Sequence, residues 1–266
     1  MMGKIRFSRK QLCIPYAIYL FCFVFVPLLV LMYYAFTDGN GQFTVKNFIH
    51  FFTQSNTLGT LVYSLVLAFV TTAVCLFIAY PVAFILAKSN VRKKAILLMV
   101  FVMPMWINFT LRVTALKEIL TAVEHNLAFH PFLNSVIGMT YDFLPFMIMP
   151  LYSTMIGIDS SLLEAARDLG AGSAKAFLSV ILPLSVPGII SGVTMVFLPA
   201  MTNYVVLDML YNSTYIMGSL IGSYFSAYDW NNGSMIAMIL LCIILIVTLV
   251  TGNTKEEQSL KKGDAL

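Results

Sequence analysis

Two aspartates of this 266-residue chain lie within or directly beside long apolar segments, where an ionised carboxylate is costly. Asp142 lies well inside one uncharged run, and Asp208 ends another. Carboxylates, amide oxygens and aromatic faces are the groups that bind organic cations in such surroundings. The sequence therefore predicts a route for a cationic solute. The candidate groups along this route are Asp208, Asp142, Tyr204, Asn203, Trp106, Asn108 and Asp229.

These candidates also have simpler interpretations. Trp106 and Trp230 could belong to the aromatic belt found at membrane surfaces. Asp142 could pair with a charge on a second subunit, and the acids near segment ends could be solvated or ion-paired. The residues concerned in that last alternative are Asp208, Asp229, Arg112 and Lys117. No metal site is expected, because the three histidines and four cysteines lack metal-ligand spacing.

A polar stretch interrupts the apolar chain in its second half. Residues 159–161 can cap a helix over 162–169, and Gly170 can end that helix. The apolar residues of this helix recur at three- and four-residue spacing and form a stripe that needs a partner. They are Leu162, Ala165, Ala166 and Leu169. Glu164 lies three residues after Ser161 and could simply complete a capping box.

A second short helix is expected over residues 173–182, ending at Pro183. Together with the glycine turn, the two helices would form a bent corner outside the bilayer, in a loop over 158–186. A rigid helical corner of this kind is suited to enter a groove on another protein.

The elements that position these residues follow from the composition. Hydrophobic residues make up 59% of the chain and charged residues only 11%, less than half of the roughly 25% typical of soluble domains. We expect an all-α polytopic membrane protein, with a single transmembrane domain over 1–266 and six transmembrane helices. The expected spans are 12–36, 60–87, 95–114, 134–157, 187–207 and 234–252.

The orientation follows from the basic residues. If the N-terminus is cytoplasmic, all but three of the 16 Lys and Arg residues fall on the cytoplasmic side. The exceptions are Lys46, Arg112 and Lys117. The positive-inside rule therefore predicts that both termini are cytoplasmic.

Small residues also indicate how the helices pack. The run over 209–228 is nearly long enough to cross the bilayer, but a seventh crossing would violate the charge bias, so we expect a re-entrant or interfacial segment. Gly188 and Gly192 form one GxxxG pair, and Gly218 and Gly222 form another. Such pairs let helix backbones approach closely, although chance pairs also occur.

The spacing of the polar stretch is more specific than its parts. It contains EAA at 164–166, then three residues, Gly170, nine residues, Val180, one residue and LP at 182–183. This resembles the EAA loop of permease subunits in bacterial ATP-binding-cassette importers, where isoleucine is usual in place of Val180. In that family the loop is a coupling helix that docks in a groove of the cytoplasmic ATPase. The residues that the resemblance assigns to coupling are Glu164, Ala165, Ala166, Leu169, Gly170 and Pro183.

Other stretches are similar to permeases of spermidine/putrescine importers. They are AYPVAFILAKS (79–89), VMPMWINFTLRVTALKEIL (102–120), LPFMIMPLYS (144–153), LPAMTNYVVLDML (198–210) and YDWNNGSMIAM (228–238). The resemblance implies a type I importer fold in a bacterial plasma membrane. The implied partners are a homologous second permease, two copies of an ATPase and an extracytoplasmic polyamine-binding protein. It also implies that this chain is not an enzyme and holds no cofactor, because ATP and Mg would bind the ATPase.

Three other functions are compatible with parts of the pattern. A permease for iron, sulfate or phosphate would share the loop, but an anion carrier should show bases in its spans, where this chain has acids. A secondary transporter or channel would leave the EAA-type loop without a role. An intramembrane enzyme is disfavoured, because the sequence has no HExxH or GxSxG motif.

Overall fold

The computed structural model describes residues 13–88, 94–211 and 216–263, and these residues are almost entirely helical. Five helices are long and apolar enough to cross a membrane, or six if a bent pair counts as one span. The five are Pro15–Ala35, Ser55–Lys88, Pro131–Ile156, Ser173–Thr202 and Trp230–Leu249, and the bent pair is Lys94–Trp106 with Phe109–Glu124. The expected all-α membrane fold is confirmed.

The chain divides into two compact units, the first formed by residues 1–58 and 220–243. Its first span consists of α1 (Cys13–Leu20), the π-helical η2 (Phe21–Phe25) and α2 (Val26–Ala35), and α3 (Lys46–Thr53) follows. The Asn231 side-chain amide donates to the carbonyls of Tyr34, at 3.1 Å, and Thr37, at 2.7 Å. These bonds tie the end of the first span to the start of the last one, α13 (Trp230–Gly263).

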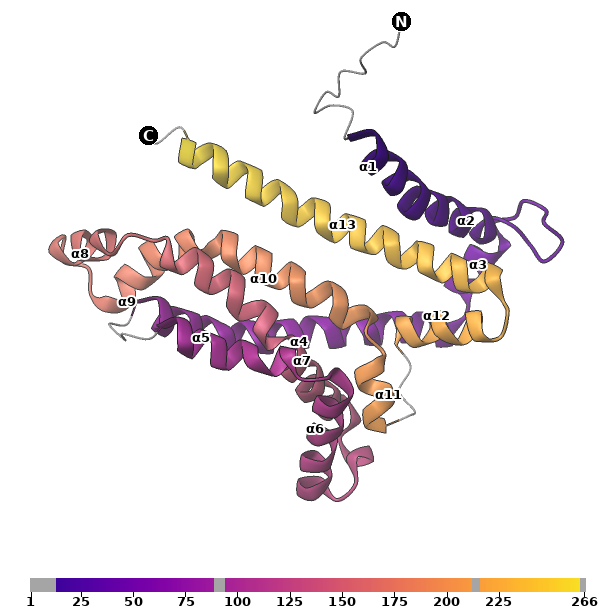
Figure 1. Ribbon diagram of the computed structural model, residues 1–266, viewed down its shortest axis with the longest axis horizontal. Coiled ribbons are helices and arrows are strands. Elements are labelled where there is room, and N and C mark those ends of the chain that lie inside the picture. The colour runs from indigo at the N-terminus through magenta and orange to yellow at the C-terminus, as the bar shows by residue number, and fades with distance from the viewer. Residues whose placement is uncertain (1–12, 89–93, 212–215, 264–266) are drawn as a thin grey trace, which may run out of the picture. The chain divides into compact units, whose positions relative to one another are not determined.

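The second unit is formed by residues 59–219 and 244–266 and holds most of the candidate site residues. It contains most of α4 (Ser55–Lys88). The elements that follow are α5 (Lys94–Val102), η3 (Met103–Trp106), α6 (Phe109–Glu124), η4 (Leu127–Phe129), α7 (Pro131–Ile156), α8 (Ser160–Asp168), α9 (Ser173–Ala176), η5 (Phe177–Ile181), α10 (Leu182–Thr202), α11 (Val205–Tyr211) and the start of α12 (Met217–Ser226). Figure 1 shows α6 turned away from α5, with α11 beside it.

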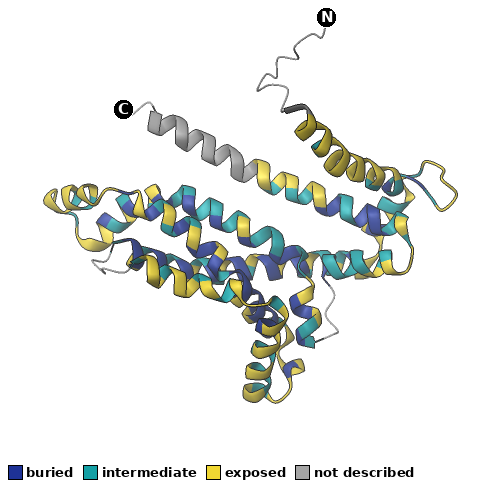
Figure 2. Cartoon of the chain, in the orientation of Figure 1, coloured by how far each residue is buried: buried dark blue, intermediate teal, exposed yellow. Residues whose placement is uncertain are grey.

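The core of the second unit is the close packing of α10 against α7, the most buried helix (Figure 2). A Cβ on Gly188 would lie 2.7 Å from Thr154 Oγ1, and one on Gly192 would lie 2.5 Å from Met147 Sδ. This GxxxG pair therefore does what its spacing predicts, because only glycine permits such an approach. A Cβ on Gly218 would likewise lie 1.9 Å from the Thr202 carbonyl.

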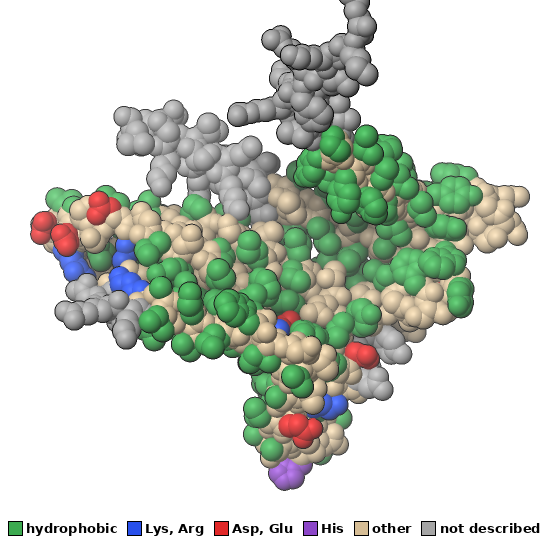
Figure 3. Space-filling model, viewed as in Figure 1, with side chains coloured by type: hydrophobic (Ala, Val, Ile, Leu, Met, Phe, Trp, Pro, Cys, Tyr) green, Lys and Arg blue, Asp and Glu red, His purple; other side chains and the backbone are tan. Residues whose placement is uncertain are grey.

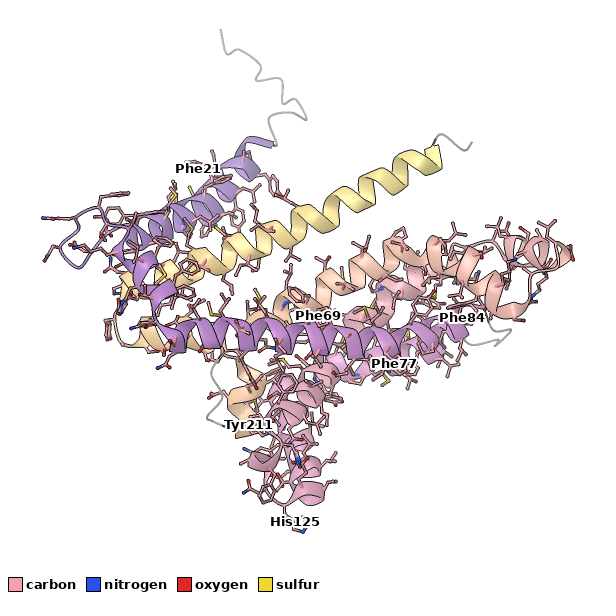
Figure 4. All side chains as sticks on the ribbon, turned by 180° about the vertical axis from the view of Figure 1, so that it is seen from behind. Phe21, Phe69, Phe77, Phe84, His125 and Tyr211 are labelled. Carbon is pink, nitrogen blue, oxygen red and sulfur yellow. The ribbon has the colours of Figure 1, made fainter. Side chains whose placement is uncertain are left out.

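Helix α4 packs one face on this core and leaves aromatic side chains on another. The Tyr80 and Ser185 hydroxyls are 2.9 Å apart, and the rings of Phe84 and Phe177 meet edge to face. Phe69 and Phe77 are exposed, and Figure 4 shows them with Phe84 along the length of α4. An apolar exposed face of this kind suits contact with lipid.

Two of the expected spans differ from the helices observed. The third, expected over 95–114, breaks after Trp106, and α6 continues at an angle of 95°. The fifth, expected over 187–207, instead runs from Ser173 to Thr202 and breaks before α11. Both spans break earlier than expected for the same reason, since the hydropathy of a run does not reveal a single asparagine that caps a new helix inside it.

The expected re-entrant or interfacial segment over 209–228 contains no span-length helix among its described residues. It includes the end of α11 and the whole of α12, while residues 212–215 lie outside the described part of the chain.

Candidate functional site

The coupling helix predicted from the EAA pattern is α8. Its N-cap is Asp159, whose carboxylate accepts a hydrogen bond of 3.0 Å from the backbone N–H of Ser161. This bond holds the pKa of Asp159 below its usual value. Glu164 is then the fifth helical residue and not the third, so the capping-box alternative for Glu164 is wrong. Its side chain is exposed.

The C-terminus of α8 is closed by a Schellman turn. Gly170 has φ +81°, its N–H donates to the Arg167 carbonyl at 2.9 Å, and the Ala171 N–H donates to the Ala166 carbonyl at 3.0 Å. This six-to-one and five-to-two pattern requires a left-handed residue at the position of Gly170. The turn redirects the chain sharply into α9.

The predicted apolar stripe of α8 has no cover within the described chain. Leu169 is 89% exposed and Leu162 is 46% exposed, while Ala165 is exposed and Ala166 is half-buried. Figure 3 shows charged side chains gathered at this end of the second unit, over α8 and α9. An exposed leucine at each end of a charged helix is suited to dock in a groove.

The second helix of the predicted corner is not a separate element. Helix runs without a break from Ser173 to Thr202, so the expected end at Pro183 is wrong. The π-helical turn at Phe177–Ile181 explains this, because the Leu182 N–H there donates to the Phe177 carbonyl, five residues back. The widened turn precedes the exposed Pro183, whose ring would otherwise crowd the preceding turn. The corner therefore continues through α9 and the π-helical turn into α10 without a break.

Sequence reasoning missed a tie between this corner and α4. The Lys88 ammonium, on the last residue of α4, donates to the carbonyl of Ile158, which directly precedes the α8 N-cap. The Lys94 ammonium donates to the Ala87 carbonyl at 2.9 Å. In the sequence only the positive charge of these lysines was informative, and we used it to predict the orientation of the chain in the membrane.

Four of the candidate residues lie at two helix breaks, after Trp106 and after Thr202. Asn108 caps α6, with its side-chain oxygen accepting from the Thr110 N–H at 3.0 Å, and Asn203 accepts from the Val205 N–H at 3.1 Å at the start of α11. Both asparagines thus start a new helix within an apolar run. Trp106, at the first break, is 84% exposed, and Tyr204, at the second, is also exposed.

Asp142 is held by an ion pair within the chain. Its carboxylate lies 2.7 Å from Arg112 Nη2, and both side chains are 8% exposed. The pair joins the first turns of α6 to the middle of α7. Arg112 is therefore not available to Asp208 or Asp229, and the partner of Asp142 belongs to this chain. A carboxylate paired and buried in this way is a poor contact for a passing cation.

The two remaining acids have different surroundings. Asp229 is half-buried and caps the start of α13, accepting from Asn232 N–H at 3.1 Å and from its side-chain amide at 2.7 Å. Asp208 is exposed on α11, and within the described residues its carboxylate has no hydrogen-bond or ion-pair partner. Lys117 does not pair with it, since its ammonium donates to the Met209 carbonyl at 2.9 Å. Among the candidate acids, Asp208 alone is open to a cation.

Comparisons with known proteins identify the family of the chain. Residues 79–253 match the family described as binding-protein-dependent transport system inner membrane component. The chain is 33% identical, over 92% of its length and 93% of the relative, to the spermidine/putrescine transport system permease protein PotB of Haemophilus influenzae. It is 32% identical to PotB of Escherichia coli, over 87% of this chain and 92% of the relative.

Solved structures support the fold. A crystal structure of a bacterial alginate ABC transporter, in complex with alginate pentasaccharide-bound periplasmic protein, matches with a TM-score of 0.73 at 13% identity, over 93% of both chains. A second alginate importer structure matches with a TM-score of 0.69 at 14% identity, over 93% of this chain and 94% of that one. The predicted type I importer fold and the resemblance to polyamine permeases are confirmed. The chain belongs to the inner membrane components of binding-protein-dependent transport systems and is a multi-pass membrane permease.

Proposed function

We propose that this chain is a permease subunit of an ATP-driven importer of spermidine and putrescine. It would form half of the translocation pathway with a homologous second permease. Its α8 corner would dock on a dimer of separate ATPase subunits that bind ATP and Mg, and an extracytoplasmic polyamine-binding protein would deliver the substrate. We place it in a bacterial plasma membrane with both termini cytoplasmic, as the basic residues predict.

The exposed α8 corner is the observation that carries this proposal. Glu164 is free of a capping role, Leu169 is 89% exposed, and the Schellman turn fixes the corner in one shape. A groove on the ATPase would cover this surface. Residues 173–202 form one helix, so movement of the docked corner would pass directly into the span that packs on α7.

The substrate assignment is supported by the charges at the second helix break. Asp208 is exposed, whereas Arg112 and Lys117 both have acceptors within the chain. Helix C-termini also favour cations, and α10 ends with its carbonyls at this break. The named function of the relatives from Haemophilus influenzae and Escherichia coli, spermidine/putrescine transport, fits a polycation at this position.

Transport would proceed by alternating access. ATP-driven closure of the ATPase dimer would shift α8. The continuous helix over residues 173–202 would then move relative to the helices that pack around it. Tyr204 and Trp106 would offer aromatic faces to the alkyl-ammonium chain while Asp208 holds one ammonium group. Binding energy contributes to the cycle only where it differs between the two states.

The test is uptake by proteoliposomes that contain the complete transporter, at saturating polyamine-loaded binding protein. Asp208→Asn should reduce uptake about fivefold, since an exposed ammonium–carboxylate contact contributes about 1 kcal/mol. Asp208→Glu should retain most of the uptake. Glu118→Gln is the matched control, because Glu118 is likewise an exposed acid, carried by α6 instead of α11.

Three outcomes would refute the proposal. The first is unchanged uptake in Asp208→Asn, which would remove the cation role of this residue. The second is uptake of sulfate or phosphate in place of polyamine by the wild-type complex, which would assign another substrate. The third is polyamine flux through the chain in the absence of any ATPase, which would indicate a secondary transporter or channel.

A further inference from the structure

Helix α11, which carries Asp208, is held at its last residue by the Tyr211 hydroxyl, which donates to the Pro131 carbonyl of α7 at 2.7 Å, and it has two further attachments to its neighbours in the second unit. The first is to α6, where the Lys117 ammonium donates to the Met209 carbonyl at 2.9 Å, next to Asp208 in the chain. The second is to α7, where a Cβ on Gly138 would lie 2.7 Å from Leu210 Cδ1 and 3.1 Å from Val206 Cγ1. Two side chains of α11 thus lie where only a glycine leaves room.

The helix that provides the first attachment is itself fixed at both ends. The Arg112–Asp142 pair holds its first turns, and the Asn134 side-chain amide donates to Glu124 at its last residue, at 2.7 Å. Figure 4 shows Tyr211 on α11 beside α6, which ends near His125. A short helix held to such a fixed support cannot tilt freely.

We infer that Lys117 is a positioning residue for the Asp208 carboxylate, and that the Gly138 notch serves the same purpose. The inference rests on the proposed function, since it concerns how the cation-binding carboxylate is presented. A seven-residue helix has too few internal hydrogen bonds to hold its own orientation. The carbonyl of Met209 directly follows Asp208 in the chain, so the bond from Lys117 restrains α11 next to the carboxylate, while the Tyr211 hydroxyl restrains the end of the helix.

The sign of the effect separates positioning from simple electrostatics. Removing the Lys117 charge makes the surroundings of Asp208 more negative, and by charge alone this should favour a polycation. Loss of positioning should instead decrease uptake, because the carboxylate no longer meets the ammonium group at contact distance. The two explanations therefore predict opposite changes for Lys117→Met.

The experiment is a mutant cycle in the reconstituted complex, with uptake and ATP hydrolysis measured at saturating loaded binding protein. Lys117→Met and Gly138→Ala are each made alone and in the Asp208→Asn background, and Lys117→Arg tests rescue by a second donor. We expect each single variant to lower uptake about threefold with little change in ATP hydrolysis, and neither to lower it further once Asp208 is replaced. Lys46→Met is the matched control, since it removes an exposed lysine of the first unit.

Several results would overturn the inference. These are higher uptake in Lys117→Met, no rescue by Lys117→Arg, or losses that simply multiply with that of Asp208→Asn. Gly138→Ala keeps the charge unchanged, so it decides the question if Lys117→Met assembles poorly. If Asp208→Asn itself has no effect, the proposed cation site fails. If Asp208→Asn lowers uptake but the other two variants do not, only the positioning inference fails.

Discussion

Replacement of Gly170 tests the proposed coupling role of the α8 corner, because the cost of the replacement can be worked out from the backbone alone. Gly170 has φ +81°, and a Cβ added there would meet no atom within 4 Å. The penalty therefore comes only from the left-handed conformation, which costs a residue other than glycine about 1–2 kcal/mol. Gly170→Ala and Gly170→Leu should suffer equally, and Gly170→Asn should suffer less because asparagine tolerates this region.

The same change two residues later provides the control. Gly172 also has open space around it, but its φ of −60° is accessible to any residue, so Gly172→Ala should be nearly neutral. A penalty of about 1.4 kcal/mol lowers tenfold the equilibrium ratio of the corner with its Schellman turn formed to the corner with this turn broken. In Gly170→Ala we therefore expect polyamine uptake per ATP hydrolysed to fall severalfold, while membrane insertion is retained.

Two measurements check this expectation. Uptake and ATP hydrolysis are compared in the same proteoliposomes, and amide hydrogen exchange reports whether the last turn of α8 opens. Equal coupling in Gly170→Ala and Gly172→Ala would refute the reasoning. Equal loss in Gly170→Asn and Gly170→Ala would show that the side chain, and not the backbone, carries the effect.

The remaining predictions concern the buried pair and the α8 cap. Arg112→Met or Asp142→Leu alone should destabilise the protein by about 3–5 kcal/mol, because each leaves a buried unpaired charge. The double variant should recover most of that loss in thermal unfolding in detergent, and equal instability of all three would contradict it. The pKa of the Asp159 carboxylate is lower in the folded state than its usual value of 3.8, so at pH values above 3.8 the ionised carboxylate stabilises the start of α8. This contribution should be lost as the pH falls through the lower, folded-state pKa. Amide exchange in α8, corrected for intrinsic rates, should show this transition in the wild type and not in Asp159→Asn.

The helix breaks show where sequence reasoning stopped short. Asn108 and Asn203 are favourable N-caps, and an asparagine within an apolar run is a signal that we used only for substrate contact. The chain turns through 95° between Trp106 and Phe109, and the fifth span ends at Thr202. Hydropathy is averaged over a window of many residues, so one asparagine changes the average little, and these breaks were missed. Pro183 led to the opposite error. We expected a helix to end there, but the π-helical turn before it lets the helix continue.

The sequence by itself determined the features that depend on local order along the chain. Uninterrupted apolar runs predicted the membrane helices, and the EAA spacing predicted the coupling corner with its glycine turn. Only the tertiary structure decided which acid remains open to a cation. Arg112 and Asp142 are 30 residues apart, and Lys117 and Met209 are 92 apart. These pairings depend on which helix faces meet in the fold. The spacing of residues along one helix does not specify which face of another helix it contacts. Asp208 is left as the open carboxylate because Arg112 pairs with Asp142 and the Lys117 ammonium donates to the Met209 carbonyl.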